Sequence, residues 1–313
     1  MPFKTSVIIP TYNRPLELQN CIRSILEQTL KPDELFIVDD GDLVEFPFKK
    51  ELEAADIGCF YLKKAVPGLT ASRNEGIKSA GGDIIFFFDD DVVLEPDYIK
   101  EIIKVYRKDT DDSIGGVGGL QSNRYLSKFK NYLLWFAESL FLVNGIREGR
   151  VLPSGFCVDF GTTPFPIKKD SYVDFLAGCA MSFRRNVFQE FQFDSKQYLG
   201  YGLGEDKDFS FRVSRKYRLI VNPHAKLLHL ESPKMRSNKK AMGQGYVIAN
   251  YLFFSNYSGK SLVSRFLFYY AIFGYLITRS LMAVLSPNKE NFARISGIIE
   301  GIKYIFSNRR LVV

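Results

Sequence analysis

Three short apolar runs near the start of the chain each end in polar residues, and this pattern limits the possible folds more than any other feature. The runs are SVIIP before Thr11-Tyr12-Asn13, ELFIV before Asp39-Asp40-Gly41, and DIIFFF before Asp89-Asp90-Asp91. Their apolar residues are continuous rather than alternating, which indicates strands buried on both faces. Amphipathic segments lie between them, so we expect a mostly parallel sheet flanked by helices. Because ligands bind beyond the carboxyl ends of such strands, the polar clusters mark the expected site.

The composition excludes several classes of protein. Of 313 residues, 46% are hydrophobic and 25% are charged, which excludes a disordered or low-complexity chain. Four widely spaced cysteines form no C-x-x-C pair, so we expect no cysteine zinc site and a reducing compartment. No charged segment followed by a long apolar one opens the chain, so no secretory signal is expected. Residues 234–313 hold twelve basic and two acidic residues, which suits an anionic membrane surface or nucleic acid.

We expect three parts, at residues 1–110, 111–232 and 233–313. The first alternates strands and helices, the second is more mixed, and the third is a basic tail that combines a flexible segment, 232–245, with an apolar segment, 262–285. The other expected elements are helices at 16–29, 70–80, 96–108, 128–143 and 205–217, strands at 59–64, 117–122, 174–185, 218–223 and 226–231, and a long loop at 145–172.

Acidic residues in two places could carry chemistry. The adjacent carboxylates Asp89, Asp90 and Asp91 repel one another, and a divalent cation would compensate them. A solvated acidic loop explains these three residues equally well. Glu205 and Asp206 open a predicted helix, where acids also occur simply because the helix dipole favours them. A catalytic role for this pair therefore requires a partner site.

Few other residues suit binding or catalysis. His229 lies in a predicted strand, where a lone histidine is more often structural, but near the aspartates it becomes a candidate third metal ligand. His224 is the weaker candidate. Arg14 and Arg73 could bind a diphosphate at the sheet edge or be ordinary surface arginines. The chain has no P-loop, no dinucleotide-binding glycine motif and no G-x-S-x-G nucleophile turn.

Four segments follow one another in a specific order: SVIIPTYNRPLELQNCIRSILEQT, IVDDG, ASRNEGIKSAGGDIIFFFDDDVVLEPDYI and GYGLGEDKDFSFR. Over about residues 5–231, the chain thereby resembles the family 2 glycosyltransferases of the GT-A fold. The resemblance implies an α/β fold with a mostly parallel central sheet. It also implies inverting transfer of a sugar from a nucleotide-diphospho-sugar with Mn²⁺ or Mg²⁺. Residues 1–110 would form the nucleotide-sugar-binding half, and 111–232 the acceptor-binding and catalytic half.

The resemblance also implies roles for individual residues. Asp206 would be the general base, with Glu205 beside it. Asp89, Asp91 and His229 would bind the metal. Inverting transfer is a single displacement, so it needs one acidic metal site and a separate base, and this sequence has both. The expected contacts to the donor nucleotide are Pro10, Thr11 and Tyr12 around the nucleobase, Asp40 as an acceptor for the base, Asp89 and Asp90 near the ribose, Arg73, and Arg14.

The apolar segment 262–285 lies outside the resemblance. Its uninterrupted part, 266–278, would extend about 20 Å as a helix, less than the roughly 30 Å hydrocarbon core of a bilayer. Spanning would also require burying Arg279, which is expensive. We therefore expect an interfacial or re-entrant membrane helix, and the alternative is a core helix pair packed on the catalytic domain.

These features predict a cytoplasmic glycosyltransferase, peripheral at the inner face of a membrane, that builds a surface polysaccharide or glycoconjugate. Its acceptor would be a glycan or a lipid-linked sugar, contacted by loop 145–172 and the aromatic helix before it. A UDP-sugar is the expected donor, with thymidine and guanosine nucleotides as alternatives. A polyprenyl-phosphate glycosyl synthase, a sugar-nucleotide hydrolase and a catalytically silent subunit of a glycan assembly complex stay open. The basic tail lacks a nucleic-acid-binding motif, so no nucleic acid partner is expected.

Overall fold

The computed structural model describes residues 3–43, 48–124, 129–198, 203–231, 238–259 and 261–307. The chain divides into two compact units. The first comprises Met1–Asn123, Ile167–Tyr201 and Glu205–Glu231, and the second comprises Arg124–Pro166, Gly202–Gly204 and Ser232–Val313. The segment 124–166 thus shares a unit with the C-terminal helices. The division of the chain at residues 110 and 232 stays a prediction.

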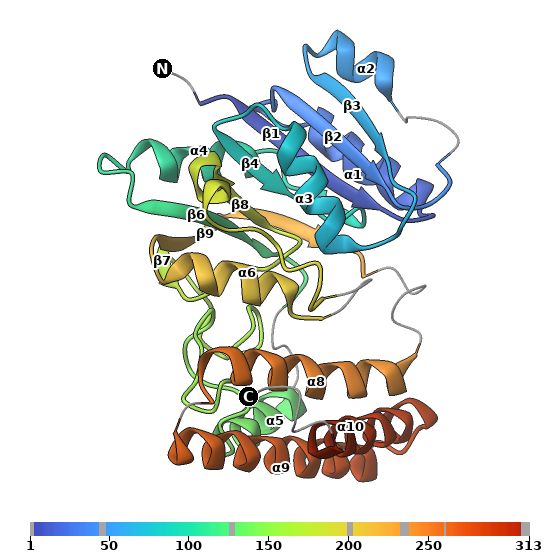
Figure 1. Cartoon of the computed structure of the whole chain (residues 1–313), viewed down its shortest axis with the longest axis vertical. Helices are drawn as coiled ribbons and strands as arrows, with labels where there is room; N and C mark the ends of the chain where they lie inside the picture. The colour runs from blue at the N-terminus through green and yellow to red at the C-terminus, as the bar shows by residue number, and fades with distance from the viewer. Residues whose placement is uncertain are drawn as a thin grey trace. The chain divides into compact units, whose positions relative to one another are not determined.

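The first unit contains the expected α/β sheet (Figure 1). It begins with β1 (Thr5–Thr11), α1 (Pro15–Leu26), β2 (Glu34–Asp39), α2 (Lys49–Ala54), β3 (Gly58–Lys63), α3 (Leu69–Ser79) and β4 (Ile84–Phe87). These four strands are parallel, in the order β3-β2-β1-β4. Thr11 pairs with Asp39 at the carboxyl ends of β1 and β2, so the polar residues that follow both strands meet at one edge.

The second half of this unit extends the same sheet. It consists of β5 (Val92–Leu94), α4 (Tyr98–Arg107), β6 (Ile114–Gln121), β7 (Ser171–Val173), β8 (Met181–Arg184), the 3₁₀ helix η1 (Arg185–Gln189), α6 (Glu205–Ser214) and β9 (Arg218–His229). The strand order is β3-β2-β1-β4-β8-β6-β9-β5, and β7 also pairs with β9. Strand β8 is antiparallel to both β4 and β6, so this half of the sheet is mixed rather than parallel.

Some element boundaries differ from the prediction. The strand predicted at 174–185 exists only as β8, because the residues before it form a turn in which Ala180 N donates to Ala177 O at 2.9 Å. The two strands predicted at 218–223 and 226–231 are one strand, β9. Its register with β6 shifts around Pro223, which has no N–H to donate, so the ladder is interrupted but the strand continues. Helix α4 begins at Tyr98 rather than Pro96.

Side chains cover the sheet on both faces, as the continuous apolar runs predict. Val7 and Phe86 point to one face and pack into a core with residues of α1 and α4. Phe87 points to the other face, where its ring meets those of Phe183, Phe188 and Phe193. Phe209 of α6 stacks on the last two of these rings. Burying each such side chain contributes roughly 1.5–3 kcal/mol, so β4 is held firmly where its acidic end reaches the sheet edge.

The second unit is helical. It contains α5 (Phe129–Leu140), α8 (Lys239–Tyr257), α9 (Leu262–Leu285) and α10 (Lys289–Ser307). Its core contains Phe156, Val247, Phe254, Phe268 and Ile298. The segment 145–166 has little regular structure apart from one bridge between Val151 and Cys157, which agrees with most of the loop predicted at 145–172. The last two residues of that predicted loop, 171 and 172, belong to β7 instead.

The C-terminal region is more helical than predicted. Of the segment expected to be flexible, residues 232–237 lie outside the described residues, whereas 239–245 begin α8, which Asn238 caps by accepting from Ala241 N at 2.9 Å. Helix α9 continues through Arg279 and is about 36 Å long. Within the described ranges it is the one helix that is long and apolar enough to cross a membrane, with 39% of its most apolar window buried.

Candidate functional site

The loops that follow β1 and β2 are tied to each other at the edge of the sheet. Pro10 and Thr11 are buried at the end of β1. Asn13, in a left-handed conformation with φ of 54°, accepts a hydrogen bond through Oδ1 from Asp42 N at 2.8 Å. A Cβ on Gly41 would lie 2.4 Å from that oxygen. Only glycine therefore allows the two loops to approach this closely.

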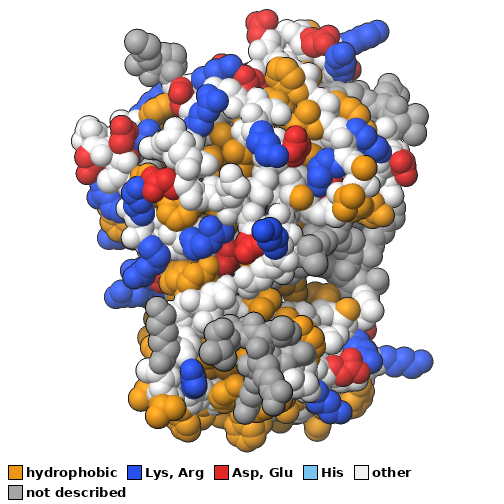
Figure 2. Space-filling view, in the orientation of Figure 1, with side chains coloured by type: hydrophobic (Ala, Val, Ile, Leu, Met, Phe, Trp, Pro, Cys, Tyr) orange, Lys and Arg blue, Asp and Glu red, His pale blue; other side chains and the backbone are white. Residues whose placement is uncertain are grey.

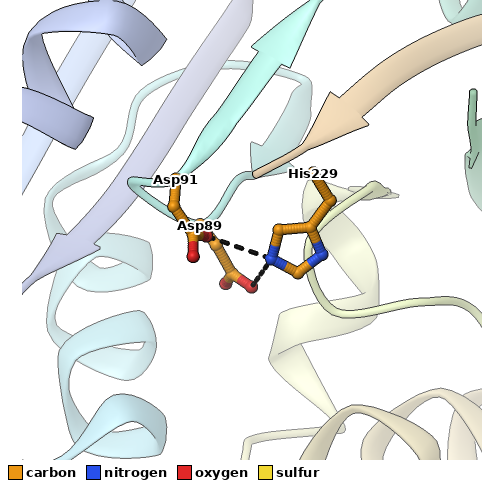
Figure 3. A group of neighbouring side chains, drawn as sticks. All are labelled: Asp89, Asp91 and His229. Carbon is orange, nitrogen blue, oxygen red and sulfur yellow. Dashed lines mark hydrogen bonds and ion pairs between the residues drawn. The ribbon is translucent and has the colours of Figure 1, made fainter. Parts of the chain in front are cut away.

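Asp89, Asp91 and His229 form a compact cluster at the same edge (Figure 3). Each residue offers one ligand atom, and these atoms lie within 4.8 Å of one another. His229 Nε2 is 3.0 Å from Asp91 Oδ1 and 4.0 Å from Asp89 Oδ2. The sheet register brings them together, because Val92, which follows Asp91, pairs antiparallel with His229. Leu230 N also donates to Asp91 O at 2.9 Å.

The donor set of this cluster fits a divalent cation. Burial lowers the pKa of His229, but the hydrogen bond to Asp91, the nearby Cys179 and the charge of Asp89 outweigh burial and raise that pKa to about 11. Binding of a cation to the imidazole nitrogen would displace a proton from it, so metal affinity would depend on pH. Carboxylate oxygens suit Mg²⁺ and Mn²⁺, and an imidazole nitrogen suits transition metals. The residues present thus fit the cation that the resemblance implies.

The middle aspartate, Asp90, faces the protein interior, and its side chain is 0% exposed. It accepts hydrogen bonds from Thr11 Oγ1 at 2.8 Å and from Arg14 Nε at 3.2 Å. Arg14 Nη1 also donates to Asp91 Oδ2 at 3.1 Å. Burial raises the pKa of Asp90 to about 7, while Arg14 and Thr11 act in the opposite direction. The structure ties these three residues to one another, and their contacts with a donor stay predictions.

Arg73 is a buried cation between the two groups of acids. It is 1% exposed. Its Nη1 donates to Glu205 Oε1 at 3.1 Å, and its Nη2 donates to Asp89 Oδ1 at 3.4 Å. Burial and the charge of Asp206 raise the pKa of Glu205 to about 7, and Arg73 opposes that rise. The metal-ligating cluster and the acidic pair on α6 are therefore linked through one arginine, whose contact with a nucleotide stays a prediction.

Asp206 is held in the first turn of α6 by two backbone donors. Its Oδ2 accepts from Gly178 N at 2.8 Å, and its Oδ1 accepts from Lys207 N at 2.9 Å. The carbonyl of Gly178 accepts from Arg73 Nη2 at 3.3 Å. A Cβ on Gly178 would lie 3.0 Å from the Asp206 Cβ and 3.1 Å from Arg73 Nη2. The backbone of Gly178 therefore positions both the acid and the arginine.

Tyr12 and Asp40 occupy the other end of the site. Tyr12 is 38% exposed, so its ring is accessible at the sheet edge. Asp40 is buried and accepts hydrogen bonds from Gly68 N at 2.8 Å, Ser72 Oγ at 2.7 Å and Lys64 Nζ at 3.0 Å. These bonds fix the start of α3 against the loop after β2. A contact of either residue with a nucleobase stays a prediction.

Sequence reasoning missed three residues around the site: Gly178, Cys179 and Asn123. Cys179 is among the groups that raise the pKa of His229, and its Sγ accepts from Gln121 Nε2 at 3.2 Å. Asn123 Nδ2 donates to His229 O at 2.8 Å. The available signal for Gly178 and Cys179 was the run of small residues that interrupts the predicted strand, because glycine in a strand pattern favours a turn or a close backbone approach.

Known proteins share parts of this sequence. The glycosyltransferase GlyA of Streptococcus pneumoniae is 34% identical over 102 residues, which are 32% of this chain and 15% of GlyA. The poly(ribitol-phosphate) β-N-acetylglucosaminyltransferase TarP of Staphylococcus aureus is 22% identical over 244 residues, which are 75% of this chain and 68% of TarP. Three curated relatives, GlyA among them, are matched over only 15% to 37% of their own lengths.

Solved structures and family models extend these comparisons. The mannosyltransferase PcManGT from Pyrobaculum calidifontis, in complex with GDP-Man and Mn²⁺, has a TM-score of 0.57 at 15% identity, covering 96% of this chain and 88% of that one. This likeness confirms the GT-A fold. Residues 6–191, more than half of the chain, match the model of glycosyl transferase family 2. The predicted family is thereby confirmed: the chain belongs to glycosyl transferase family 2.

Proposed function

We propose that this chain is an inverting glycosyltransferase. It would move a sugar from a nucleotide-diphospho-sugar to a hydroxyl group of a glycan or lipid-linked acceptor. One observation carries the proposal: in a chain of this family, the cluster of Asp89, Asp91 and His229 is linked through Arg73 to a second carboxylate centre on α6. Metal binding and proton removal would therefore be assigned to different elements of one unit.

Asp89, Asp91 and His229 would hold Mn²⁺ or Mg²⁺. When bound, such a cation neutralises the negative charge that develops on a leaving nucleoside diphosphate. PcManGT binds GDP-Man and Mn²⁺, which supports a metal-dependent donor site on this fold. Arg14, paired with Asp91, would keep that carboxylate in place when the cation is absent.

Asp206 would act as the general base. In a single displacement, the acceptor oxygen forms a bond to the anomeric carbon while the bond from that carbon to the diphosphate oxygen breaks. The proton of the acceptor hydroxyl passes to Asp206. The backbone N–H groups of Gly178 and Lys207 would hold the Asp206 carboxylate in a fixed orientation. Glu205 is buried and bonded to Arg73, so we assign it to holding the arginine while Asp206 takes the proton.

A UDP-sugar is the donor that we propose. The exposed ring of Tyr12 would stack on the nucleobase. Asp40 would accept a hydrogen bond from a base N–H.

The similarity to TarP and the character of the C-terminal region support an acceptor class and a location for the enzyme. TarP is named for transfer of N-acetylglucosamine to poly(ribitol phosphate), which supports a glycan acceptor. The basic C-terminal region and the apolar helix α9 support contact with a membrane. We therefore place the enzyme in the cytoplasm, peripheral at the inner membrane face, in the synthesis of a surface polysaccharide or glycoconjugate.

Substitution of His229 tests the metal site. The variant His229→Ala should bind Mn²⁺ at least about tenfold more weakly than the unmodified protein, because it loses one of three ligands. Free Mn²⁺ measured by electron paramagnetic resonance during a titration reports this affinity. The matched control is His224→Ala, an exposed histidine on the same strand, which should leave the affinity unchanged. Equal affinity in His229→Ala and the unmodified protein would show that the cluster is not the metal site.

Substitution of Asp206 tests the base. Asp206→Asn should lower kcat for sugar transfer about 10²- to 10⁴-fold, because the amide cannot take the hydroxyl proton. Binding of donor nucleotide with Mn²⁺ should be unchanged. The matched control is Asp97→Asn, which alters the N-cap of α4 and should keep full activity. Retained activity in Asp206→Asn would mean that another group accepts the proton.

A third substitution tests the role of the Gly178 backbone. Gly178→Ala should lower kcat about tenfold, because the added Cβ would lie 3.0 Å from the Asp206 Cβ and displace that carboxylate. KM for the donor should rise less than kcat falls, because Arg73 Nη2, 3.1 Å from the added Cβ, is displaced as well. The parallel variant Ala177→Gly, at the adjacent position, controls for disturbance of the turn. A loss confined to KM, with kcat intact, would contradict a positioning role for Gly178.

A further inference from the structure

The second unit exposes a long apolar stripe on α9. Leu262, Phe266, Phe273 and Val284 are each more than half exposed. Their spacings of 4, 7 and 11 residues place them on one face of the helix, from its first turn to its last. Figure 2 shows hydrophobic side chains gathered over this part of the molecule. Apolar surface of this extent normally marks an interaction site.

Helix α5 widens this stripe into a face. The Tyr270 hydroxyl of α9 donates to Leu140 O of α5 at 3.2 Å. A Cβ on Gly274 would meet the Phe141 ring, so the two segments are in close contact. Leu133 and Phe136, like Leu140, are more than half exposed and share one side of α5. We call the exposed apolar residues of α5 and α9 the apolar face.

In the sequence, the charge of Arg279 counts against insertion of this segment into a membrane. In the structure, that charge is neutralised within the protein. Arg279 Nη2 donates to Glu138 Oε1 at 2.5 Å, and the guanidinium lies 5.0 Å from the Tyr275 ring centroid. Glu138 is buried on α5. Arg265, the other charged residue of α9, lies in its first turn and donates to Gly259 O at 3.0 Å. The stripe therefore continues past Arg279 without a free charge.

The packing of α9 excludes a helix surrounded by lipid. On the side away from the stripe, Phe268 is fully buried and stacks on Phe254 of α8 at 4.3 Å. Tyr269 stacks on Phe306 of α10 at 5.5 Å. Helix α10 carries Glu300, which pairs with Lys240 of α8 at 2.7 Å. A membrane-spanning α9 would take these charged helices into hydrocarbon at high energetic cost, whereas an in-plane α9 leaves them in water.

We propose that the apolar face of α5 and α9 docks on an anionic lipid bilayer, with α9 parallel to the membrane plane. Residues 234–313 hold twelve basic and two acidic residues, and this excess attracts anionic headgroups but repels a second copy of the chain. This arrangement specifies how the protein would contact the membrane, and it rests on the membrane location of the proposed function rather than on the sugar-transfer reaction. Only the apolar face would enter the bilayer, and only to a shallow depth.

Vesicle flotation of the full chain tests the proposal. The unmodified protein should float with vesicles of phosphatidylcholine and phosphatidylglycerol, and much less with phosphatidylcholine alone. Phe136→Glu and Phe273→Glu should each lower the partition coefficient about tenfold, because a charge replaces an exposed aromatic side chain that would enter the bilayer. Leu16→Glu, at an even more exposed apolar position on α1 in the first unit, is the control and should bind as the unmodified protein does.

The fluorescence of Trp135 reports the depth of insertion into the bilayer. Trp135 is the one tryptophan of the chain and precedes Phe136 on α5. An in-plane face predicts that lipids brominated near the headgroup quench its fluorescence more than lipids brominated near the bilayer centre. Stronger quenching from the bilayer centre would overturn the in-plane arrangement.

The remaining outcomes separate the proposal from its alternatives. Unchanged vesicle binding in both glutamate variants would overturn the assignment of the face. A dimeric unmodified protein that fails to bind vesicles, with Phe273→Glu monomeric, would identify a second copy as the occupant. Metal-dependent binding of UDP, measured on the same samples, reports the donor site separately. If UDP does not bind while vesicle binding is intact, the proposed reaction is refuted and the assignment of the apolar face to membrane binding still holds.

Discussion

Two arginines allow four carboxylates to lie together at one edge of the sheet, and the rest of the site depends on this balance of charge. Arg14 pairs with Asp90 and Asp91, and Arg73 pairs with Asp89 and Glu205. Without these cations, repulsion among the acids would force the loops after β4 and before α6 apart. Because Arg73 is buried, its charge is little screened, and it fixes the distance between the two acidic groups.

The same balance explains why the cluster of Asp89, Asp91 and His229 suits a divalent cation. Carboxylates outnumber the arginines, and the pKa values of Asp90 and Glu205 are raised to about 7. The site therefore carries more acid than its own cations neutralise, and a divalent ion at Asp89, Asp91 and His229 would complete the compensation.

Much of the parallel part of the sheet, β1 to β4, could be predicted from sequence. Strands buried on both faces leave a continuous apolar signal, and their polar ends mark the sheet edge without further information. The proximity of His229 to Asp91 was different. The two residues are far apart in sequence, so His229 was a metal-ligand candidate only on the condition that it lay near the aspartates, because no local pattern encodes the pairing of β5 with β9.

The features that the sequence did not predict have a common cause, because tertiary contacts rather than local sequence determine their structure. The stretch before β8 has the composition of a strand, yet Gly178 turns there so that its N–H reaches Asp206. The basic start of α8 looks flexible in sequence, but burial of Val247 and Phe254 in the core of the second unit stabilises the helix. Arg279 interrupts the apolar segment in the sequence, and the partner that neutralises it, Glu138, lies on a distant element.

The most direct test of the account is a thermal-shift panel of UDP, dTDP, GDP and CMP, each with Mn²⁺, Mg²⁺ or EDTA. A ligand that binds only the folded protein raises Tm by mass action. We predict that UDP raises Tm with a divalent cation but not with EDTA, and that Asp91→Ala abolishes the shift. Absence of a shift with every nucleotide in a folded protein, or an equal shift with EDTA and in Asp91→Ala, would contradict a metal-dependent donor site.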